Sequence, residues 1–277
     1  MKLFSICFIF FLSASFLVLA QDDEELQFKH KLGIKTGYVN LRLRDKVIST
    51  YLYTGGGIPL ELSHSFVNDK FKTNVFIKWN LNDSINTRAD ILKGFTYAGD
   101  NGTFVNDTIG YLNNQRAQIR FFTIECSVLR QLNFLSMKNI KFYLGGGLNY
   151  YSSHKKFLTL FYTNTIYDKI FSINLMGSIE FQPALKHTFK FNFSIPPIML
   201  INRNLALEDG EIPNISMTKW AFFSSNFKIC NTIGYEYKFA KRWSLEASYI
   251  FDFVNVEFPR SEKIVYQSIL GGINFLF

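Results

Sequence analysis

The feature that most constrains this chain is a two-residue alternation of apolar and polar side chains that recurs in segment after segment. Between residues 26 and 38, leucine, phenylalanine, histidine and isoleucine occupy the even positions as far as Ile34, while the odd positions carry glutamine, lysine and glycine. Successive side chains of a β-strand point to opposite faces, whereas a helix would need a period of about 3.6 residues. The segment is therefore predicted to be a strand with one apolar and one polar face.

The same alternation extends through most of the chain, and the apolar faces contain no Asp, Glu, Lys or Arg. A basic side chain on the hydrocarbon-facing wall of a membrane barrel costs about 2–4 kcal/mol at mid-bilayer, which would explain this exclusion. A soluble β-sandwich that binds a ligand is the alternative, but we expect such a fold to show more polar breaks and fewer aromatic residues near its strand ends. The further alternating segments are residues 57–66, 73–81, 140–150, 171–181, 188–195, 227–239, 243–253 and 265–277.

One segment, residues 116–128, breaks the phase of the alternation. Its apolar residues up to Phe121 occupy odd positions, whereas those from Phe122 to Val128 occupy even positions. A one-residue β-bulge at Phe121–Phe122 would restore a single apolar face. We therefore expect a bulge at this point, or a shorter strand.

The links between the alternating segments differ in length in a regular way. Short periplasmic turns and long external loops are typical of barrels that span an outer membrane. The pattern predicts an all-β chain that forms a closed, antiparallel, up-and-down transmembrane β-barrel of about ten strands, with eight as the alternative if one weak pair is misassigned. The short links are residues 67–70, 132–138, 182–187 and 240–242, and the long ones are about 40–56, 83–114, 153–167, 197–218 and 257–263.

The N-terminus has the composition of an export signal. Lys2 is followed by an uncharged apolar stretch, and Val18 and Ala20 supply the small residues that a signal peptidase requires before Gln21. An uncut anchor helix is the alternative, because the apolar stretch is nearly long enough to span a bilayer. The expected division of the chain is a cleaved signal peptide at residues 1–20, a short polar tail at residues 21–25 and the barrel at residues 26–277.

Five stretches combine alternation with glycine: LGIKTGYVNLRLR (Leu32–Arg44), GGIPLELSHSF (Gly56–Phe66), FYLGGGLNYY (Phe142–Tyr151), IGYEYKFAKRWSLEASYIF (Ile233–Phe251) and SILGGINFLF (Ser268–Phe277). Together they resemble the porin-like outer-membrane β-barrel domain of Gram-negative bacteria. This resemblance implies residence in the outer membrane of a Gram-negative bacterium, with membrane lipid as a partner. The alternating Ile273, Phe275 and Phe277 resemble the C-terminal assembly signal, which implies the barrel-assembly machinery as a partner during biogenesis.

Charged residues on the polar faces are predicted to line the lumen. A barrel of about eight to ten strands is largely filled by its own side chains, whereas open pores need about 16 strands or more. We therefore expect a packed ionic plug, with a narrow, anion-preferring conduit as the alternative. The predicted lumen charges are Lys29, Lys31, Lys35, Glu61, Lys78, Arg116, Arg120, Glu180, Lys190, Lys228, Glu236, Lys238, Glu246 and Asp252.

No motif for a metal, a phosphate or a cofactor occurs in the sequence, so no cofactor is expected. The formal net charge is +8, but the basic residues occur singly at alternate positions, and a nucleic-acid partner is therefore not expected. The loops would carry any specificity, although their sequence does not identify a ligand.

Two constellations of residues resemble parts of a hydrolase site. His64 has serines at 63 and 65, and a Ser-His pair is a feature of lipid hydrolases, but neighbours in a strand point to opposite faces. His154 and Asp168 would lie near the external rim, where a peptide hydrolase could act. We expect a non-enzymatic barrel that serves structure, adhesion or small-solute passage, with a hydrolase acting on lipid or peptide at the membrane rim as the alternative.

Overall fold

The structure is a computed structural model, and it describes residues 29–45, 52–68, 70–80, 84–87, 97–98, 104–105, 116–137, 139–158, 163–207, 215–223, 226–258 and 261–277. The expected signal peptide (1–20) and polar tail (21–25) lie outside the described residues, as does most of the predicted link 83–114. Within the described ranges, no helix has the length and apolarity needed to cross a bilayer.

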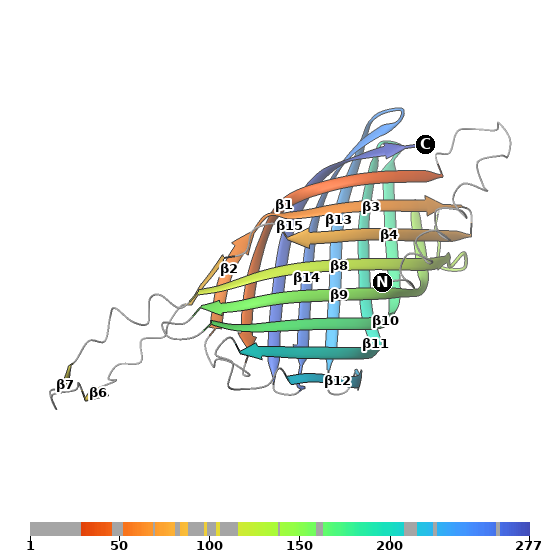
Figure 1. The fold of residues 1–277 in the computed structure, drawn as a ribbon. Coiled ribbons are helices and arrows are strands. Elements are labelled where there is room, and N and C mark those ends of the chain that lie inside the picture. The colour runs from red at the N-terminus through yellow and green to blue at the C-terminus, as the bar shows by residue number, and fades with distance from the viewer. Residues whose placement is uncertain are drawn as a thin grey trace.

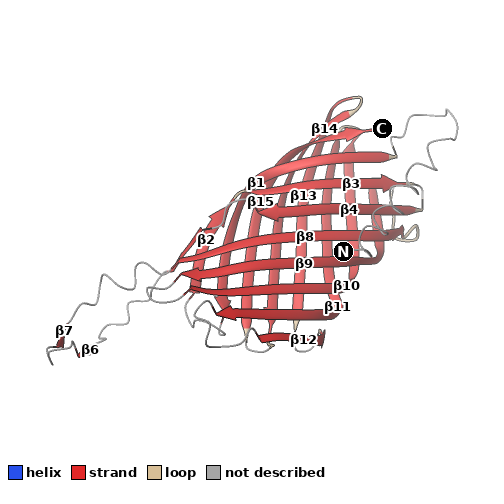
Figure 2. Cartoon of the chain, viewed as in Figure 1, coloured by secondary structure: helices blue, strands red, loops and turns tan. Residues whose placement is uncertain are grey.

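The described chain forms a closed antiparallel β-barrel (Figures 1 and 2). Successive crossings of the wall pair with one another, and the last strand pairs with the first, so the sheet closes on itself. The strands are β1 (His30–Asp45), β2 (Leu52–Gly57), β3 (Pro59–Val67), β4 (Phe71–Asn80), β5 (Ser84–Thr87), β6 (Tyr97–Ala98), β7 (Phe104–Val105), β8 (Arg116–Gln131), β9 (Ile140–Leu158), β10 (Thr163–Ala184), β11 (His187–Leu207), β12 (Ile215–Phe222), β13 (Phe227–Ala240), β14 (Trp243–Val256) and β15 (Glu262–Leu276).

Ten strands cross the wall, because several of the named strands are parts of one crossing. β2 and β3 pair with β1 in a single register and are interrupted only at Ile58, next to Pro59, which has no amide hydrogen to donate. β5 continues β4 along β8, and β12 and β13 follow one another along β11. β6 and β7 form a separate two-stranded ribbon. The predicted fold class and strand number are confirmed.

Four short turns lie at one end of the barrel, here called the turn end. They follow β3, β8, β10 and β13 and correspond to the four short links predicted from the sequence. In the turn after β3, the side chain of Asn68 accepts hydrogen bonds from the amides of Lys70 and Phe71 at 2.9 and 2.6 Å. Asparagine is favoured in turns for this local bond to the backbone. The opposite end is called the loop end.

The predicted apolar faces form an apolar belt on the outside of the wall. Leu32 and Ile34 on β1 are about half exposed, while Lys31 and Lys35, which flank them in the sequence, point into the barrel. Large apolar side chains with this exposure are suited to lipid rather than water. Other exposed members of the apolar belt are Leu62, Phe122, Leu144, Leu148, Phe171, Ile173, Leu175, Phe189, Phe191, Ile233, Leu245, Tyr249, Ile269 and Ile273.

Towards the loop end, the chemistry of the two faces is reversed while the alternation continues. On β1, Val39, Leu41 and Leu43 are buried inside the barrel, whereas Arg42 and Arg44 are exposed on the outer face. An apolar interior with a polar exterior is the pattern of a protein wall in water, so this part of the barrel stands outside the hydrocarbon. The strands therefore extend well into segments that were predicted to be loops.

The same reversal explains why the predicted bulge in the fourth crossing is wrong. β8 pairs with β9 in one unbroken register, from Arg116 opposite Leu158 to Gln131 opposite Tyr143. Ile119 and Phe121 are buried inside the barrel, and Phe122 lies on the outer face. The apolar residues change parity because the strand leaves the hydrocarbon.

A bulge does occur elsewhere, between β10 and β11. The register passes from Ile173 opposite Ile198 to Leu175 opposite Ile195, which places the extra residue of β11 at Pro196–Pro197. A bulge tolerates proline because it leaves a backbone position without a ladder hydrogen bond. Pro196–Pro197 therefore marks the point at which the outward parity of β11 changes.

Closure of the barrel depends on the close approach of β1 and β15, and a substitution at Gly37 tests this dependence. A Cβ atom added at Gly37 would lie 1.9 Å from the carbonyl oxygen of Ile269, whereas one added at Gly271 would meet no atom within 4 Å. We expect Gly37→Ala to lower the free energy of unfolding by about 1–3 kcal/mol, because backbone must shift. Gly271→Ala, on the same strand pair, should change it little. Urea unfolding in lipid or detergent provides the measurement, and equal stability of the two variants would contradict the expectation.

Candidate functional site: the barrel lumen

The lumen at the turn end holds a network of paired charges from opposite parts of the wall. Lys35 on β1 forms ion pairs with Glu61 on β3 at 3.2 Å and with Glu246 on β14 at 2.6 Å. Lys31 lies 3.1 Å from Glu236 on β13 and 3.2 Å from Glu246. These side chains are mostly buried, so the pairs are only weakly screened by solvent.

Two further lysines complete this network. Lys190 on β11 pairs with Glu236, and Lys72 on β4 pairs with Glu180 on β10 at 2.5 Å. Because β4 and β10 are not neighbours in the sheet, the second pair reaches across the lumen. Four lysines thus face four glutamates, and the network carries no net charge. The turn-end network is Lys31, Lys35, Lys72, Lys190, Glu61, Glu180, Glu236 and Glu246.

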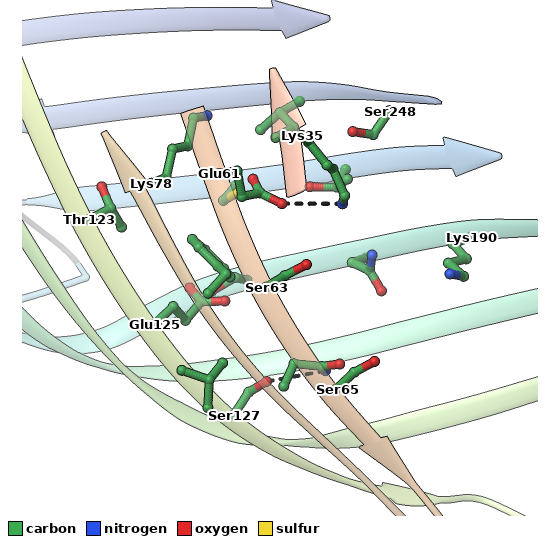
Figure 3. Close-up of a pocket in the computed structure, with 18 of the residues that line it drawn as sticks. Lys35, Glu61, Ser63, Ser65, Lys78, Thr123, Glu125, Ser127, Lys190 and Ser248 are labelled. Atoms are coloured by element: carbon green, nitrogen blue, oxygen red, sulfur yellow. Dashed lines mark hydrogen bonds and ion pairs between the residues drawn. The ribbon is translucent and has the colours of Figure 1, made fainter. Parts of the chain in front are cut away.

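A cavity of about 380 Å³ adjoins this network. Figure 3 shows Lys35 and Glu61 directed toward each other at its edge, with Lys78, Thr123 and Glu125 on the neighbouring strands. Its lining also includes Lys228, Cys230 and Asp252. The wall of the cavity therefore combines charged side chains of both signs with apolar side chains.

Beyond the cavity, toward the loop end, apolar side chains fill the lumen. Tyr151 on β9 and Tyr266 on β15 join their hydroxyl groups at 2.7 Å, and Phe121 on β8 meets the ring of Tyr266 edge-on at 4.6 Å. β15 is distant from β8 and β9 in the strand order, so these contacts cross the barrel. The apolar tier consists of Val39, Leu41, Leu43, Ile119, Phe121, Tyr151, Ile166, Ile170, Met199, Ile201, Ala221, Val254, Val256, Ile264 and Tyr266.

Four charged residues are embedded in the apolar tier and form a buried quartet. Arg203 on β11 donates to Asp168 on β10 at 2.8 Å and to Glu262 on β15 at 2.6 Å. Lys155 on β9 pairs with the same two carboxylates. Each of the four side chains is at most 4% exposed. Two cations and two anions balance, which is the condition for burying charge without a large penalty.

The predicted lumen charges do not all lie together. Arg120 is exposed on the outer face of β8, because the strand has no bulge. Lys29 is exposed at the start of the described barrel, but it also lines the cavity. The side chain of Arg116 is outside the described residues. Lys238 has lumen parity near the turn end. The remaining predicted charges line the cavity or belong to the turn-end network: Lys31, Lys35, Glu61, Lys78, Glu180, Lys190, Lys228, Glu236, Glu246 and Asp252.

Sequence reasoning missed the buried quartet, together with Lys72 and Glu125. Lys155, Arg203 and Glu262 lie in segments that are predicted to be external loops, and Asp168 directly follows one of these segments, so the sequence analysis assigns none of them to a lumen-facing position. Lys72 shares the parity of Lys78 on β4 and was detectable by extending that alternation toward the turn. The signal that could have found the quartet is that alternation continues into these segments, with apolar side chains now pointing into the lumen and polar side chains pointing outward.

The structure does not bring together the residues of either predicted hydrolase constellation. His154 stacks on Tyr167 at 4.6 Å between ring centroids on the outer face, whereas Asp168 lies inside the barrel in the buried quartet. His64 contacts His30 at 3.3 Å between ring nitrogens. Ser63 and Ser65 alternate with His64 along β3 and therefore have the opposite parity. Among the described residues, no cluster of His, Cys, Asp and Glu is placed to hold a metal ion.

Comparisons with known proteins identify the fold. No protein-family model and no curated protein sequence matches the chain. The outer-membrane protease OmpT from Escherichia coli is similar in structure with a TM-score of 0.56 and 8% identity, over 93% of this chain and 99% of OmpT. The translocator domain of the autotransporter NalP from Neisseria meningitidis gives a TM-score of 0.50 and 7% identity, over 96% of this chain and 93% of that one.

These similarities, the closed sheet and the apolar belt together define the class: the chain has the fold of an outer-membrane β-barrel protein. At 7–8% identity the likeness concerns the fold, and the activity of OmpT is not carried over.

The buried quartet makes a prediction about stability. Arg203→Met should lower the free energy of unfolding by about 3–5 kcal/mol, because it leaves two buried carboxylates against one cation. Lys263→Met is the matched control, since Lys263 is exposed next to Glu262 on the same strand and should contribute little. Denaturant midpoints of the purified barrels provide the measurement. A loss below about 1 kcal/mol in Arg203→Met would contradict the role assigned to the quartet.

Proposed function

We propose that the chain is an integral, non-enzymatic outer-membrane β-barrel protein whose lumen is closed, and that it serves a structural or adhesive role rather than the passage of solutes. The observation that carries this proposal is the apolar tier, in which Tyr151 and Tyr266 meet across the lumen at 2.7 Å. An aqueous pathway needs continuous polar space, and tightly packed apolar side chains interrupt it. The short turns then lie in the periplasm and the loop end lies outside the cell.

The apolar belt supports residence in a membrane. Its large exposed side chains would be costly on a water-soluble protein, and a closed sheet satisfies the backbone polar groups without water. The loop end supports adhesion rather than catalysis, because the polar outer face of its extended strands would stand above the membrane. No described residue constellation favours the hydrolase alternative.

The cavity favours a second candidate function, a narrow conduit that prefers anions. Besides the turn-end network, it is lined by three lysines (Lys29, Lys78 and Lys228) and two carboxylates (Glu125 and Asp252), which leaves a small positive excess. It occupies the part of the lumen nearest the turn end. Such a conduit would require the apolar tier to rearrange.

Conductance across a planar bilayer distinguishes the two candidates. We expect the unmodified protein to give no steady current steps, and Tyr151→Ala/Tyr266→Ala to give measurable steps, because the pair closes the lumen from opposite walls. Tyr38→Ala/Tyr249→Ala removes two exposed outer tyrosines and should remain silent. Steady chloride-selective steps from the unmodified protein would instead favour the conduit.

We also propose that Ile273, Phe275 and Phe277 are read by the barrel-assembly machinery. All three have outward parity; Phe275 packs against Trp243 at 5.0 Å between ring centroids, and Phe277 stacks on His30 at 5.3 Å. This row is continuous and apolar, as a recognition strand for other machinery would need to be.

The assembly role predicts a loss of insertion that is separable from a loss of stability. Phe275→Ser/Phe277→Ser should reduce the heat-modifiable, membrane-inserted fraction in cells several-fold, whereas Ile269→Ser, farther along β15, should reduce it less. Refolding of the same purified variants into lipid without the machinery provides the comparison. If the first variant fails equally in both settings, the row contributes to stability alone.

A further inference from the structure

The outer face of β8, β9 and β10 changes character abruptly toward the loop end. These three strands lie side by side in the wall (Figure 1). Ile124, Tyr150 and Phe171 are register partners and form the last fully apolar row of the apolar belt on these strands. Aromatic residues at such a position are typical of the boundary between hydrocarbon and headgroups.

Each of the next three rows beyond this boundary contains at least one basic side chain, and the first of them still includes the exposed Phe122. The next register row contains Lys169, the one after it joins Arg120 to His154 and Tyr167, and the third contains Lys156. Arg120 and Lys169 are exposed, and His154 and Lys156 are partly exposed. We call these four residues the basic patch. Rows about 7 Å apart on strands about 4.8 Å apart place them within an area roughly 15 Å across.

Carboxylates are absent from the described outer face around Arg120 and Lys169. Beyond the boundary, the outward positions that the structure describes on β8, β9 and β10 contain no Asp or Glu. Arg120 and Lys169 have no ion pair with any described residue. The patch therefore presents positive charge to whatever lies beside the wall.

The contrast with the lumen makes this arrangement informative. The turn-end network and the buried quartet both balance their charges, so the positive excess of the chain, +8 by formal count, lies outside these clusters. The basic patch concentrates part of that excess at one level of the wall. The charged clusters inside the barrel are balanced, whereas the charges of the basic patch on the outer face are all positive. This difference indicates an anionic partner outside the barrel.

The patch also has a rigid element. The rings of His154 and Tyr167 stack with centroids 4.6 Å apart and planes inclined by 2°. The register sets Arg120 beside His154 and Lys169 two residues from Tyr167. The stacked pair therefore forms a flat surface between two cations, with little side-chain entropy left to lose on binding.

We propose that the basic patch binds the phosphate groups of an anionic lipid in the outer leaflet, an inference that rests on the proposed membrane location. The patch is continuous with Tyr150 and Phe171, so one molecule can place acyl chains against the apolar belt and its phosphates against Arg120 and Lys169. Guanidinium pairs well with phosphate oxygens, through two parallel hydrogen bonds. A soluble anion would gain nothing from the adjacent apolar row.

The test compares lipid binding by charge-matched variants of the full chain. Purified protein in a neutral detergent is titrated with bis-phosphorylated lipid A, and bound lipid is measured by native mass spectrometry. We expect Arg120→Gln/Lys169→Gln to bind about 25-fold more weakly, since each cation near an anionic surface contributes about a fivefold factor. Lys241→Gln/Arg242→Gln removes two exposed cations at the turn end and should bind like the unmodified protein.

Three results would overturn the proposal: equal affinity of the two variants, equal affinity of the unmodified protein for dephosphorylated lipid A, or displacement of the lipid by inorganic phosphate at tenfold excess. Arg120→Lys/Lys169→Arg keeps both charges and should restore most of the affinity. Heat-modifiable migration of every variant reports whether the barrel is intact. A failure of the membrane location would appear as recovery of the unmodified protein outside the outer-membrane fraction of cells, independently of lipid binding.

Discussion

The structure depends on the closure of the sheet between β1 and β15. A strand edge inside hydrocarbon would leave amide and carbonyl groups without partners, and each of these would cost several kcal/mol. The pairing runs along nearly the whole of both strands, from Lys31 opposite Leu276 to Asp45 opposite Glu262. Once the sheet is closed, every side chain must point either outward or into the lumen, and the chemistry of both surfaces follows from this division.

The division has different consequences at the two ends of the barrel. Within the apolar belt, outward residues meet lipid and the lumen collects charged side chains, which find partners across the barrel, as Lys72 finds Glu180. Toward the loop end, the outside is polar and the lumen is apolar, as Leu41 and Arg42 illustrate on consecutive positions. The barrel thus behaves as a membrane protein along one part of its axis and as a water-soluble β-barrel along the rest. The basic patch lies where the two regimes meet.

We infer a closed lumen from packing more than from charge. The sequence favoured an ionic plug, and a paired network is present, but it adjoins a cavity of about 380 Å³. The cross-lumen contacts of Tyr151, Tyr266 and Phe121 lie in the apolar tier instead. Even the charges of that tier are neutralised among themselves, with Arg203 held between Asp168 and Glu262. This arrangement is the basis for proposing a closed structural or adhesive barrel.

The sequence by itself determined the strands, their antiparallel order, the short turns and the apolar belt. Alternation is a local property of each segment, and the cost of placing a charge in lipid keeps charged residues off the apolar face of every predicted strand. The sequence did not determine where the hydrocarbon ends. Arg120 was expected in the lumen and Phe121 on the lipid face, but the structure places them the other way round. Alternation could not reveal this, because it has the same period on either side of that boundary. Only the tertiary structure decided which residues meet across the lumen, since Lys155, Asp168, Arg203 and Glu262 come from four different strands and converge only when the sheet is closed.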